Sequence, residues 1–421
     1  MFERNVVRRI VLGLAAAGAL GGVLVVRHRT PSAPAARPSI SAVQQDIAFY
    51  ERRAAEDPWS AADRAVLARL YLQRGRETGE YADFQRAERA ARTSLGLRRE
   101  RNQRTLLLLA SSLLAQHRFA EARAEAETLV ASEPEQTGSR ALLAEILLEL
   151  GDYTSADSAF TLLVAHEENL AVAPRLARWH ELHGRVAEAR AILLRSAAAA
   201  RTRADLPAEQ VAWFYLRVAD QALRTGRLSE ARRALHDGLS LNPGDVRLRS
   251  ARARLAAARG DWREVLSEVA DLDGQLDLAT LALAGDAARA LRDFRLADTY
   301  YAKVEQQARA NPEPFARQWT QFCLEHGRHL DETVRTLEAE IAQRPDVLGH
   351  QLLAWAYQLT GRPNAARREI RSALRLATKD ARLEYLAGHI LGQPERLANA
   401  RKINRWFDVS APLHVLPAPR P

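Results

Sequence analysis

The chain has 421 residues, 47% of them hydrophobic and 27% charged, which excludes an intrinsically disordered polymer and allows a large folded region. The net charge is +9, and a basic protein can attract anionic lipid or nucleic acid. The basic residues are almost all arginine, which is typical of a GC-rich bacterial coding sequence and weakens the functional meaning of the charge. The single cysteine, Cys323, excludes an intramolecular disulfide, a cysteine zinc ribbon and a CxxC redox site.

A hydrophobic segment opens the chain. Residues 1–9 form a short basic tail, and residues 10–26 form an uncharged run that would span about 25 Å as a helix. Arg27 and Arg29 close this run. We interpret residues 10–26 as a transmembrane signal anchor. The alternative is a signal peptide that is cleaved near Ala33-Pro34-Ala35, after which the remaining chain is secreted.

An anchor of this kind predicts a protein of the bacterial inner membrane, with the remaining chain in the periplasm, because the N-terminal tail is very short. Gly18 and Gly22 have the GxxxG spacing that lets membrane helices approach closely, so they are candidate contacts of a homodimer. Residues 27–40 are rich in proline and alanine, which is the composition of an extended linker.

From residue 41 onwards the spacing of apolar residues predicts helices, and one pattern recurs. Within Arg104 to Asn169 three kinds of slot recur after 34 positions: Ala110 and Ala144, Phe119 and Tyr153, Ala122 and Ala156. A fixed period of 34 residues is typical of helix pairs stacked into a solenoid, because one pair alone cannot bury both of its faces.

This pattern resembles the tetratricopeptide repeat (TPR), and the resemblance covers roughly residues 58–405 in about nine units. In one copy the characteristic slots are held by Leu143, Ala144, Leu147, Gly151, Tyr153, Ala156 and Phe160. The resemblance implies an all-α fold, a right-handed α-solenoid of antiparallel helix pairs over residues 41–408. One transmembrane or signal helix would precede it, and a Pro-rich tail at residues 409–421 would follow.

In TPR-like solenoids the first helix of each pair lines the concave face, where partners bind. Carried onto this chain, the resemblance gives ten candidate partner-binding residues: Glu145, Arg178, Glu181, Asp220, Arg254, Asp286, Arg289, Gln321, Trp355 and Gln358. Leu114, Leu148 and Leu223 add an apolar element to the same face. Some TPR proteins hold a C-terminal carboxylate with Lys and Asn, and this set contains neither residue type.

Signatures of enzymes are missing from the sequence: it has no P-loop, no GxSxG elbow and no HExxH motif. His180 falls in the aromatic packing slot of its repeat, so core packing explains it. Cys323, His326 and His329 carry metal-binding groups, but Cys323 falls in a core slot and Gly327 turns the chain before His329. We therefore predict no catalytic residues, no cofactor and no metal site.

The sequence thus predicts a non-enzymatic, membrane-anchored scaffold for protein–protein interaction in the bacterial cell envelope, serving an assembly, secretion or polysaccharide system. A protein or peptide partner would occupy the concave groove. The alternative is a binder of anionic polymer or nucleic acid through arginine-rich helices such as residues 86–104. Glutamates interrupt those arginines, which favours a solvated helix face over a nucleic-acid contact.

Overall fold

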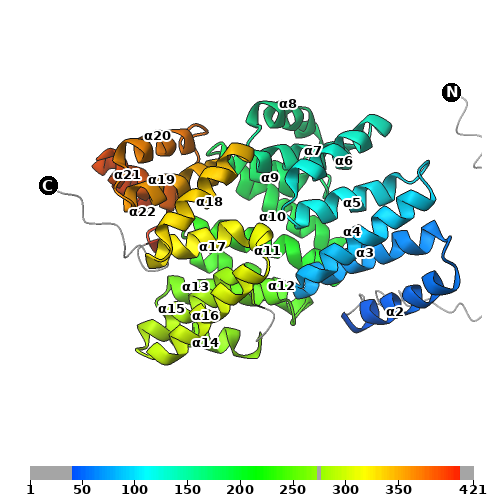
Figure 1. Ribbon diagram of the computed structural model, residues 1–421, viewed down its shortest axis with the longest axis horizontal. Helices are drawn as coiled ribbons and strands as arrows, with labels where there is room; N and C mark the ends of the chain where they lie inside the picture. The colour runs from blue at the N-terminus through cyan, green and yellow to red at the C-terminus, as the bar shows by residue number, and fades with distance from the viewer. Residues whose placement is uncertain (1–39, 273–275, 408–421) are drawn as a thin grey trace, which may run out of the picture. The chain divides into compact units, whose positions relative to one another are not determined.

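The computed structural model describes residues 40–272 and 276–407, and this part of the chain is all-helical (Figure 1). Its α-helices are α2 (Ile40–Glu56), α3 (Ala61–Thr78), α4 (Tyr81–Leu97), α5 (Gln103–Ala115), α6 (Phe119–Ser132), α7 (Thr137–Leu150), α8 (Tyr153–Leu163), α9 (Ala173–Leu182), α10 (Val186–Thr202), α11 (Ala208–Arg224), α12 (Leu228–Leu241), α13 (Val246–Ala258), α14 (Trp262–Val269), α15 (Leu278–Ala290), α16 (Phe294–Ala310), α17 (Pro312–His326), α18 (Leu330–Gln343), α19 (Val347–Leu359), α20 (Pro363–Ala373), α21 (Ala381–Leu391) and α22 (Pro394–Ile403). Two short 3₁₀-helices, Val164–His166 and Ala270–Leu272, follow α8 and α14.

Consecutive helices pack as antiparallel pairs, from α3 with α4 to α21 with α22 (Figure 1). In the pair α7–α8, Ala144 and Ala156 are both fully buried where the two helices meet. Side chains of this size let helix axes approach closely, and Phe160, which is also fully buried, fills the space beside them. The predicted TPR-like array of helix pairs is confirmed for the described residues.

The predicted leader lies outside the described residues. This applies to the basic tail, to residues 10–26 with Gly18 and Gly22, to the linker up to residue 39, and to the tail after residue 407. Among the helices that are described, none combines the length and the apolar character needed to cross a membrane.

Left-handed residues end the first helices of the pairs. Gly151 closes α7 with a φ of 76°, and its N–H and that of Asp152 bond back to carbonyls in the last turn of α7. Glycine adopts this conformation without the steric cost that a Cβ atom brings. His117 holds the corresponding position after α5 with a φ of 61°. Its Cβ atom makes this left-handed conformation sterically less favourable than it is for glycine.

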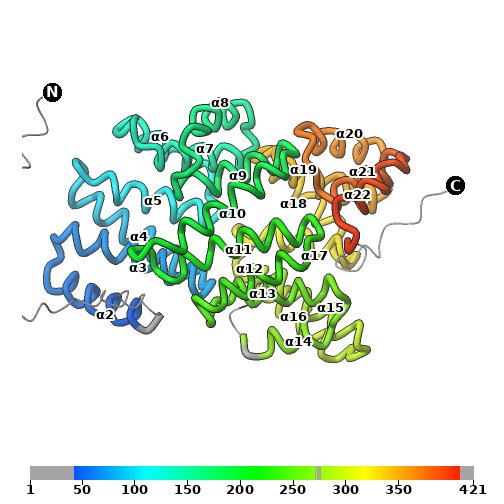
Figure 2. Tube along the Cα trace, turned by 180° about the vertical axis from the view of Figure 1, so that it is seen from behind, coloured from blue at the N-terminus to red at the C-terminus, as the bar shows by residue number. Residues whose placement is uncertain are grey.

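The early repeats contact the late repeats along a line that we call the seam. It joins the turns after α5, α7, α9 and α11 to the first turn of α17 and to segments next to α19, α21 and α22. Its contact pairs are His117 with Pro314, Gly151 with Pro345, Gly184 with Ala377, and Gly226 with Asn404. Hydrogen bonds along the seam join residues 181 to 224 positions apart. Accordingly, α17–α19 lie beside α7–α11 in both views of the chain (Figures 1 and 2).

Seam side chains cap the first helices from a distance. The guanidinium of Arg344 donates to the Glu149 carbonyl at the end of α7, and the hydroxyl of Thr378 donates to the Leu182 carbonyl at the end of α9. The amide of Asn404 donates to the Leu223 carbonyl at the end of α11, at 3.1 Å. The last carbonyls of a helix have no partner inside the helix, so these donors satisfy them, although the Leu223 carbonyl also accepts the Gly226 N–H at 3.2 Å.

Candidate functional site

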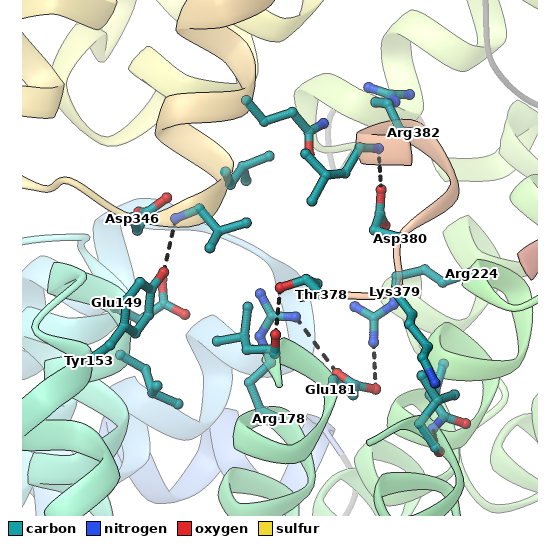
Figure 3. A pocket seen from close by; sticks show the side chains of 18 of the residues that line it. Glu149, Tyr153, Arg178, Glu181, Arg224, Asp346, Thr378, Lys379, Asp380 and Arg382 are labelled. Carbon is teal, nitrogen blue, oxygen red and sulfur yellow. Dashed lines mark hydrogen bonds and ion pairs between the residues drawn. The ribbon is translucent and has the colours of Figure 1, made fainter. Parts of the chain in front are cut away.

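A cavity of about 320 Å³ lies on the seam between the first helices of early and late repeats (Figure 3). Its early wall comes from α7, α9 and α11, and its late wall comes from α17, α19 and the segment that leads into α21. Charged and apolar groups alternate in its lining. The charged residues are Glu149, Arg178, Glu181, Arg224, Arg317, Arg344, Asp346, Lys379, Asp380 and Arg382, and the apolar ones include Leu148, Val347, Leu348 and Leu383.

Two smaller hollows adjoin this cavity and share residues with it. One contains Leu114 and shares Glu149, Arg317, Arg344 and Leu348 with the cavity. The other contains Leu223 and shares Arg224, Asp380 and Arg382. We call the three together the inner cleft. It extends from α5 to α15 and follows the first helices of successive repeats.

Glu181 is the buried centre of the early wall. Arg224 donates to its carboxylate at 2.7 Å, and Arg178 lies 3.7 Å from it (Figure 3). Arg217, outside the cavity lining, lies 3.9 Å from the same carboxylate. Burial alone would raise the pKa of Glu181, but Arg224, Arg217 and Arg178 together hold it below its ordinary value. Three guanidinium groups thus share one carboxylate, which leaves an excess of positive charge on this wall.

The late wall is held by a second group of ion pairs. Arg317 donates a hydrogen bond to Asp346 at 2.7 Å and forms an ion pair with Glu340, 2.6 Å away. Arg344 bonds to Asp346 at 2.7 Å and crosses the seam to the carboxylate of Glu149. Asp346 also accepts the Gly349 N–H at the start of α19, so the same carboxylate caps a helix and orients two arginines.

Half of the ten predicted partner-binding residues line the inner cleft: Glu145, Arg178, Glu181, Arg254 and Gln321. Asp220 does not line it but bonds to Arg254 at 2.7 Å. The predicted apolar element is distributed over all three hollows, with Leu114, Leu148 and Leu223 in one hollow each.

The other four predicted residues lie elsewhere. Trp355 is fully buried in the core, so its side chain is not available to a partner. Asp286 accepts hydrogen bonds from Tyr301 in its own repeat and from His326 at the end of α17 in the next repeat. The Arg289 guanidinium lies 5.9 Å from the ring centre of the exposed Phe294. Gln358 is half-buried near the end of α19.

The repeat pattern missed the residues that reach the cleft from connecting segments. Arg344, Asp346, Lys379 and Asp380 lie between repeats, outside the regular slots. The period of the repeat predicts which residues face inwards within one unit. It does not predict how many units complete a turn, so it cannot reveal which connections meet which helix ends.

Cys323 and His326, which carry metal-binding groups, are buried or hydrogen-bonded within the fold. Burial raises the pKa of the Cys323 thiol to about 12, so the thiol stays protonated at neutral pH. His326 bonds to Asp286 at 2.9 Å and to the Phe322 carbonyl at 2.8 Å. No group of three His, Cys, Asp or Glu side chains within residues 40–272 and 276–407 is arranged to hold a metal ion.

No protein-family model matches the chain, and no curated protein matches it. Solved structures with a similar chain path include a tetratricopeptide repeat protein from Parabacteroides merdae, with 14% identity, a TM-score of 0.38 and coverage of 59% of this chain and 97% of that one. Human IFIT1, as a dimer with m7Gppp-AAAA, has 15% identity, a TM-score of 0.48 and coverage of 80% and 77%. Yeast Tom70 has 12% identity, a TM-score of 0.36 and coverage of 88% and 89%. These likenesses concern the fold alone, and the chain's own helix pairs and turns are what make it a TPR-like array.

Proposed function

We propose that this protein is a non-enzymatic scaffold that holds an extended segment of a partner protein in the inner cleft. The observation that carries the proposal is the composition of the cleft. Each hollow combines a leucine from an early repeat with arginine side chains, and Leu348 on the late wall keeps 37% of its surface exposed between two of the hollows. Apolar anchors with polar groups around them are typical of peptide-binding and ligand-binding sites.

The charges of the cleft favour a partner segment with acidic residues between apolar ones. Within the described chain, the guanidinium of Arg178, which lines the cavity, makes no hydrogen bond to an acceptor, because its ion pair with Glu181 is too long at 3.7 Å. A carboxylate of the partner that entered beside Arg178 would gain charge-assisted hydrogen bonds in a partly desolvated site.

The location of the scaffold is part of the proposal. Residues 10–26 anchor the chain in the inner membrane of a bacterium, and the helical array lies in the periplasm, where it serves envelope assembly, secretion or a polysaccharide system. Gly18 and Gly22 pair two anchors into a homodimer. The sequence of the leader supports these points through its apolar run, its basic flanks and its GxxxG spacing.

Site-specific photo-crosslinking in the native cell tests the proposed function. A photoreactive amino acid replaces Leu348 in the cleft of the full-length protein. The matched control is Leu194 on α10, which also keeps 37% of its surface exposed and lines none of the three hollows. We expect a defined protein adduct at position 348 and none at position 194. Equal labelling at both positions would contradict the proposal.

Recovery of nucleic acid alone from position 348 would favour the alternative, a binder of anionic polymer. Steep loss of binding with added salt would accompany that outcome. The arginine-rich helix α4 gives little support to the alternative, because Arg86 bonds to the buried Asp83 at 2.7 Å and Arg92 bonds to Glu88 at 2.9 Å. Such pairs reduce the charge that is available to a polyanion.

A further inference from the structure

We propose that residues 408–421 of the chain itself occupy the end of the inner cleft that lies next to α15. This end is the hollow of about 240 Å³ that contains Leu223, and we call it the Leu223 hollow. Residues 408–421, which we call the tail, lie outside the described residues. Their place is inferred from where the described chain ends and from the chemistry of the hollow and of the tail.

The described chain ends in the wall of this hollow. Asn404 and Phe407 both line it, and Phe407 is the last described residue. The Asn404 amide is fixed by its bond to the Leu223 carbonyl at 3.1 Å, and the Phe407 ring centre lies 5.5 Å from that of Tyr385. Because consecutive Cα atoms are about 3.8 Å apart, the tail begins at the edge of the hollow.

The hollow presents apolar surface that is still partly open to solvent. Its apolar lining residues are Leu223, Ala257, Ala258, Leu283, Ala381 and Phe407. Leu223 on α11 and Leu283 on α15 are only partly buried, although each lies on the first helix of its repeat. An aliphatic side chain that entered beside them would remove apolar surface from water, which favours binding.

The tail carries side chains that suit such a hollow. Its large aliphatic residues are Val409, Leu413, Val415 and Leu416. Its prolines favour an extended chain over a helix and reduce the conformational entropy that the segment would lose on binding. Because the tail is covalently tied to the wall of the hollow, its effective concentration there is about millimolar, so weak contacts are enough to keep the hollow occupied.

The charges of the hollow suit the start of the tail. Arg224, Arg254 and Arg382 line the hollow, and Asp380 is the only acidic residue that lines it. Each of these arginines already pairs at 2.7 Å with a carboxylate outside the lining, but a guanidinium has five N–H donors and can bind a second carboxylate. Asp408, the first residue of the tail and its only acidic one, would meet these arginines.

The tail and a partner would compete for the inner cleft, and this consequence rests on the proposed function. The Leu223 hollow shares Arg224, Asp380 and Arg382 with the central cavity, so a partner that extends through the cleft has to displace the tail (Figure 3). Deletion of residues 408–421 should therefore raise the yield of the partner adduct at position 348 by at least about threefold. An unchanged yield would refute the competition.

The test of the tail site is photo-crosslinking within the purified full-length protein, without a partner. A photoreactive amino acid replaces Leu283, and mass spectrometry of the digested protein identifies the joined peptides. The control is Leu291, in the turn after α15, which keeps 38% of its surface exposed and lines none of the three hollows. We expect residues 408–421 to be joined to position 283 at least about tenfold more often than to position 291.

A reciprocal probe leaves the helical array unchanged. A photoreactive amino acid at Leu413, in the tail, should be joined to peptides of α11, α15 or α21, which carry lining residues of the hollow. In the protein with the probe at position 283, Leu413→Ser with Leu416→Ser should lower the tail adduct by about tenfold or more, because apolar contacts are lost. Ala411→Ser with Ala418→Ser is the matched control and should leave the yield unchanged.

Equal labelling from positions 283 and 291, or a tail adduct that survives the loss of both leucines, would overturn the tail site. Mixing isotope-labelled with unlabelled protein identifies adducts between two molecules, and a hollow filled only by the tail of a second copy would also overturn it. The result is separate from the test at position 348. A tail adduct without a partner adduct would refute the proposed function alone, and a partner adduct without a tail adduct would refute the tail site alone.

Discussion

The side-chain amide of Asn404 donates a hydrogen bond to the carbonyl of Leu223, 181 residues earlier in the chain. Leu223 is the penultimate residue of α11, and Asn404 follows α22, the last helix of the described array. The bond repeats what Arg344 does for α7 and Thr378 for α9. One donor for each successive early repeat indicates a regular alignment of the two walls.

Asn404→Ala should lower the free energy of unfolding more than the same substitution at an exposed asparagine. Asn404 is 8% exposed, and its side chain also accepts the Trp406 N–H at 3.0 Å. Loss of these bonds should lower the free energy of unfolding by about 1–2 kcal/mol. The exposed Asn364→Ala is the control and should change it by less than about 0.5 kcal/mol. Equal urea midpoints for the two variants would show that the contact at Leu223 contributes nothing.

Ala144→Phe should overpack the interface between α7 and α8. Ala144 is fully buried, so a phenyl ring there has no space and should destabilise the protein by about 1–3 kcal/mol. The control is Ala124→Phe on the exposed face of α6, where a ring projects into solvent. Thermal unfolding separates the two, and an unchanged transition for Ala144→Phe would contradict the assignment of close helix pairs.

The repeat period was enough to predict this interface, but not the cleft as a whole. Ala144, Ala156 and Gly151 are specified by local physics, because helix approach and a left-handed turn restrict the residue type at each position. The contact of Asn404 with Leu223 depends on the small rotation between successive repeats, summed over many units. No local pattern encodes that sum, so the late wall could not be predicted.

Trp355 is a residue for which the repeat pattern suggested a partner contact that the structure does not allow. The repeat placed it on the inward side of a first helix, where a large aromatic ring suggests a partner contact. The structure has it fully buried, with the Arg382 guanidinium 5.9 Å from its ring centre. Inward-facing residues of a wall that meets another wall become core, and sequence spacing does not distinguish this case from an open groove.

His326 should make the stability depend on pH. Burial lowers the pKa of His326, and the hydrogen bond to Asp286 raises it. The rise is larger than the fall, so the pKa of His326 lies above its ordinary value. The stabilisation from the charged ring is fully present below about pH 6.5, the pKa in the unfolded chain, and is lost as the pH rises through the higher folded pKa.

The measurement is the free energy of unfolding as a function of pH for the native chain and for Asp286→Asn. We expect the native chain to lose stability from about pH 6.5 upwards, and the variant to lose much less over that range. His236→Gln, at an exposed position on α12, is the control and should follow the native curve. Identical slopes for the native chain and Asp286→Asn would refute the role of this pair.

Glu77→Gln should stabilise the protein at neutral pH. Glu77 is 3% exposed, and its Oε2 has no hydrogen-bond partner among the described residues. Burial raises the pKa of Glu77, and the nearby Glu209 raises it further, while the hydrogen bond from Gln73 at 3.0 Å and the charge of Arg247 oppose the shift without cancelling it. A raised carboxyl pKa means that the ionised form costs stability above that pKa, and the cost disappears as the pH falls towards about 4.3, where both states are protonated.

We therefore expect a gain of about 1 kcal/mol for Glu77→Gln at pH 7, which shrinks as the pH falls. The exposed Glu56→Gln on α2 should give no gain at either pH. Denaturant unfolding at both values checks this expectation. A loss of stability at pH 7 would show that the carboxylate of Glu77 has a compensating partner.

The central claim is that the inner cleft holds a partner protein, and the most direct test is the yield of the crosslink from position 348 in cells. In the background of Arg178→Gln, this yield should fall by about tenfold or more, because charge-assisted bonds to the partner are lost. In the background of Arg233→Gln, at an exposed arginine of α12, the yield should stay unchanged. An adduct at position 348 that survives the loss of Arg178, or one that forms equally at position 194, would contradict the account.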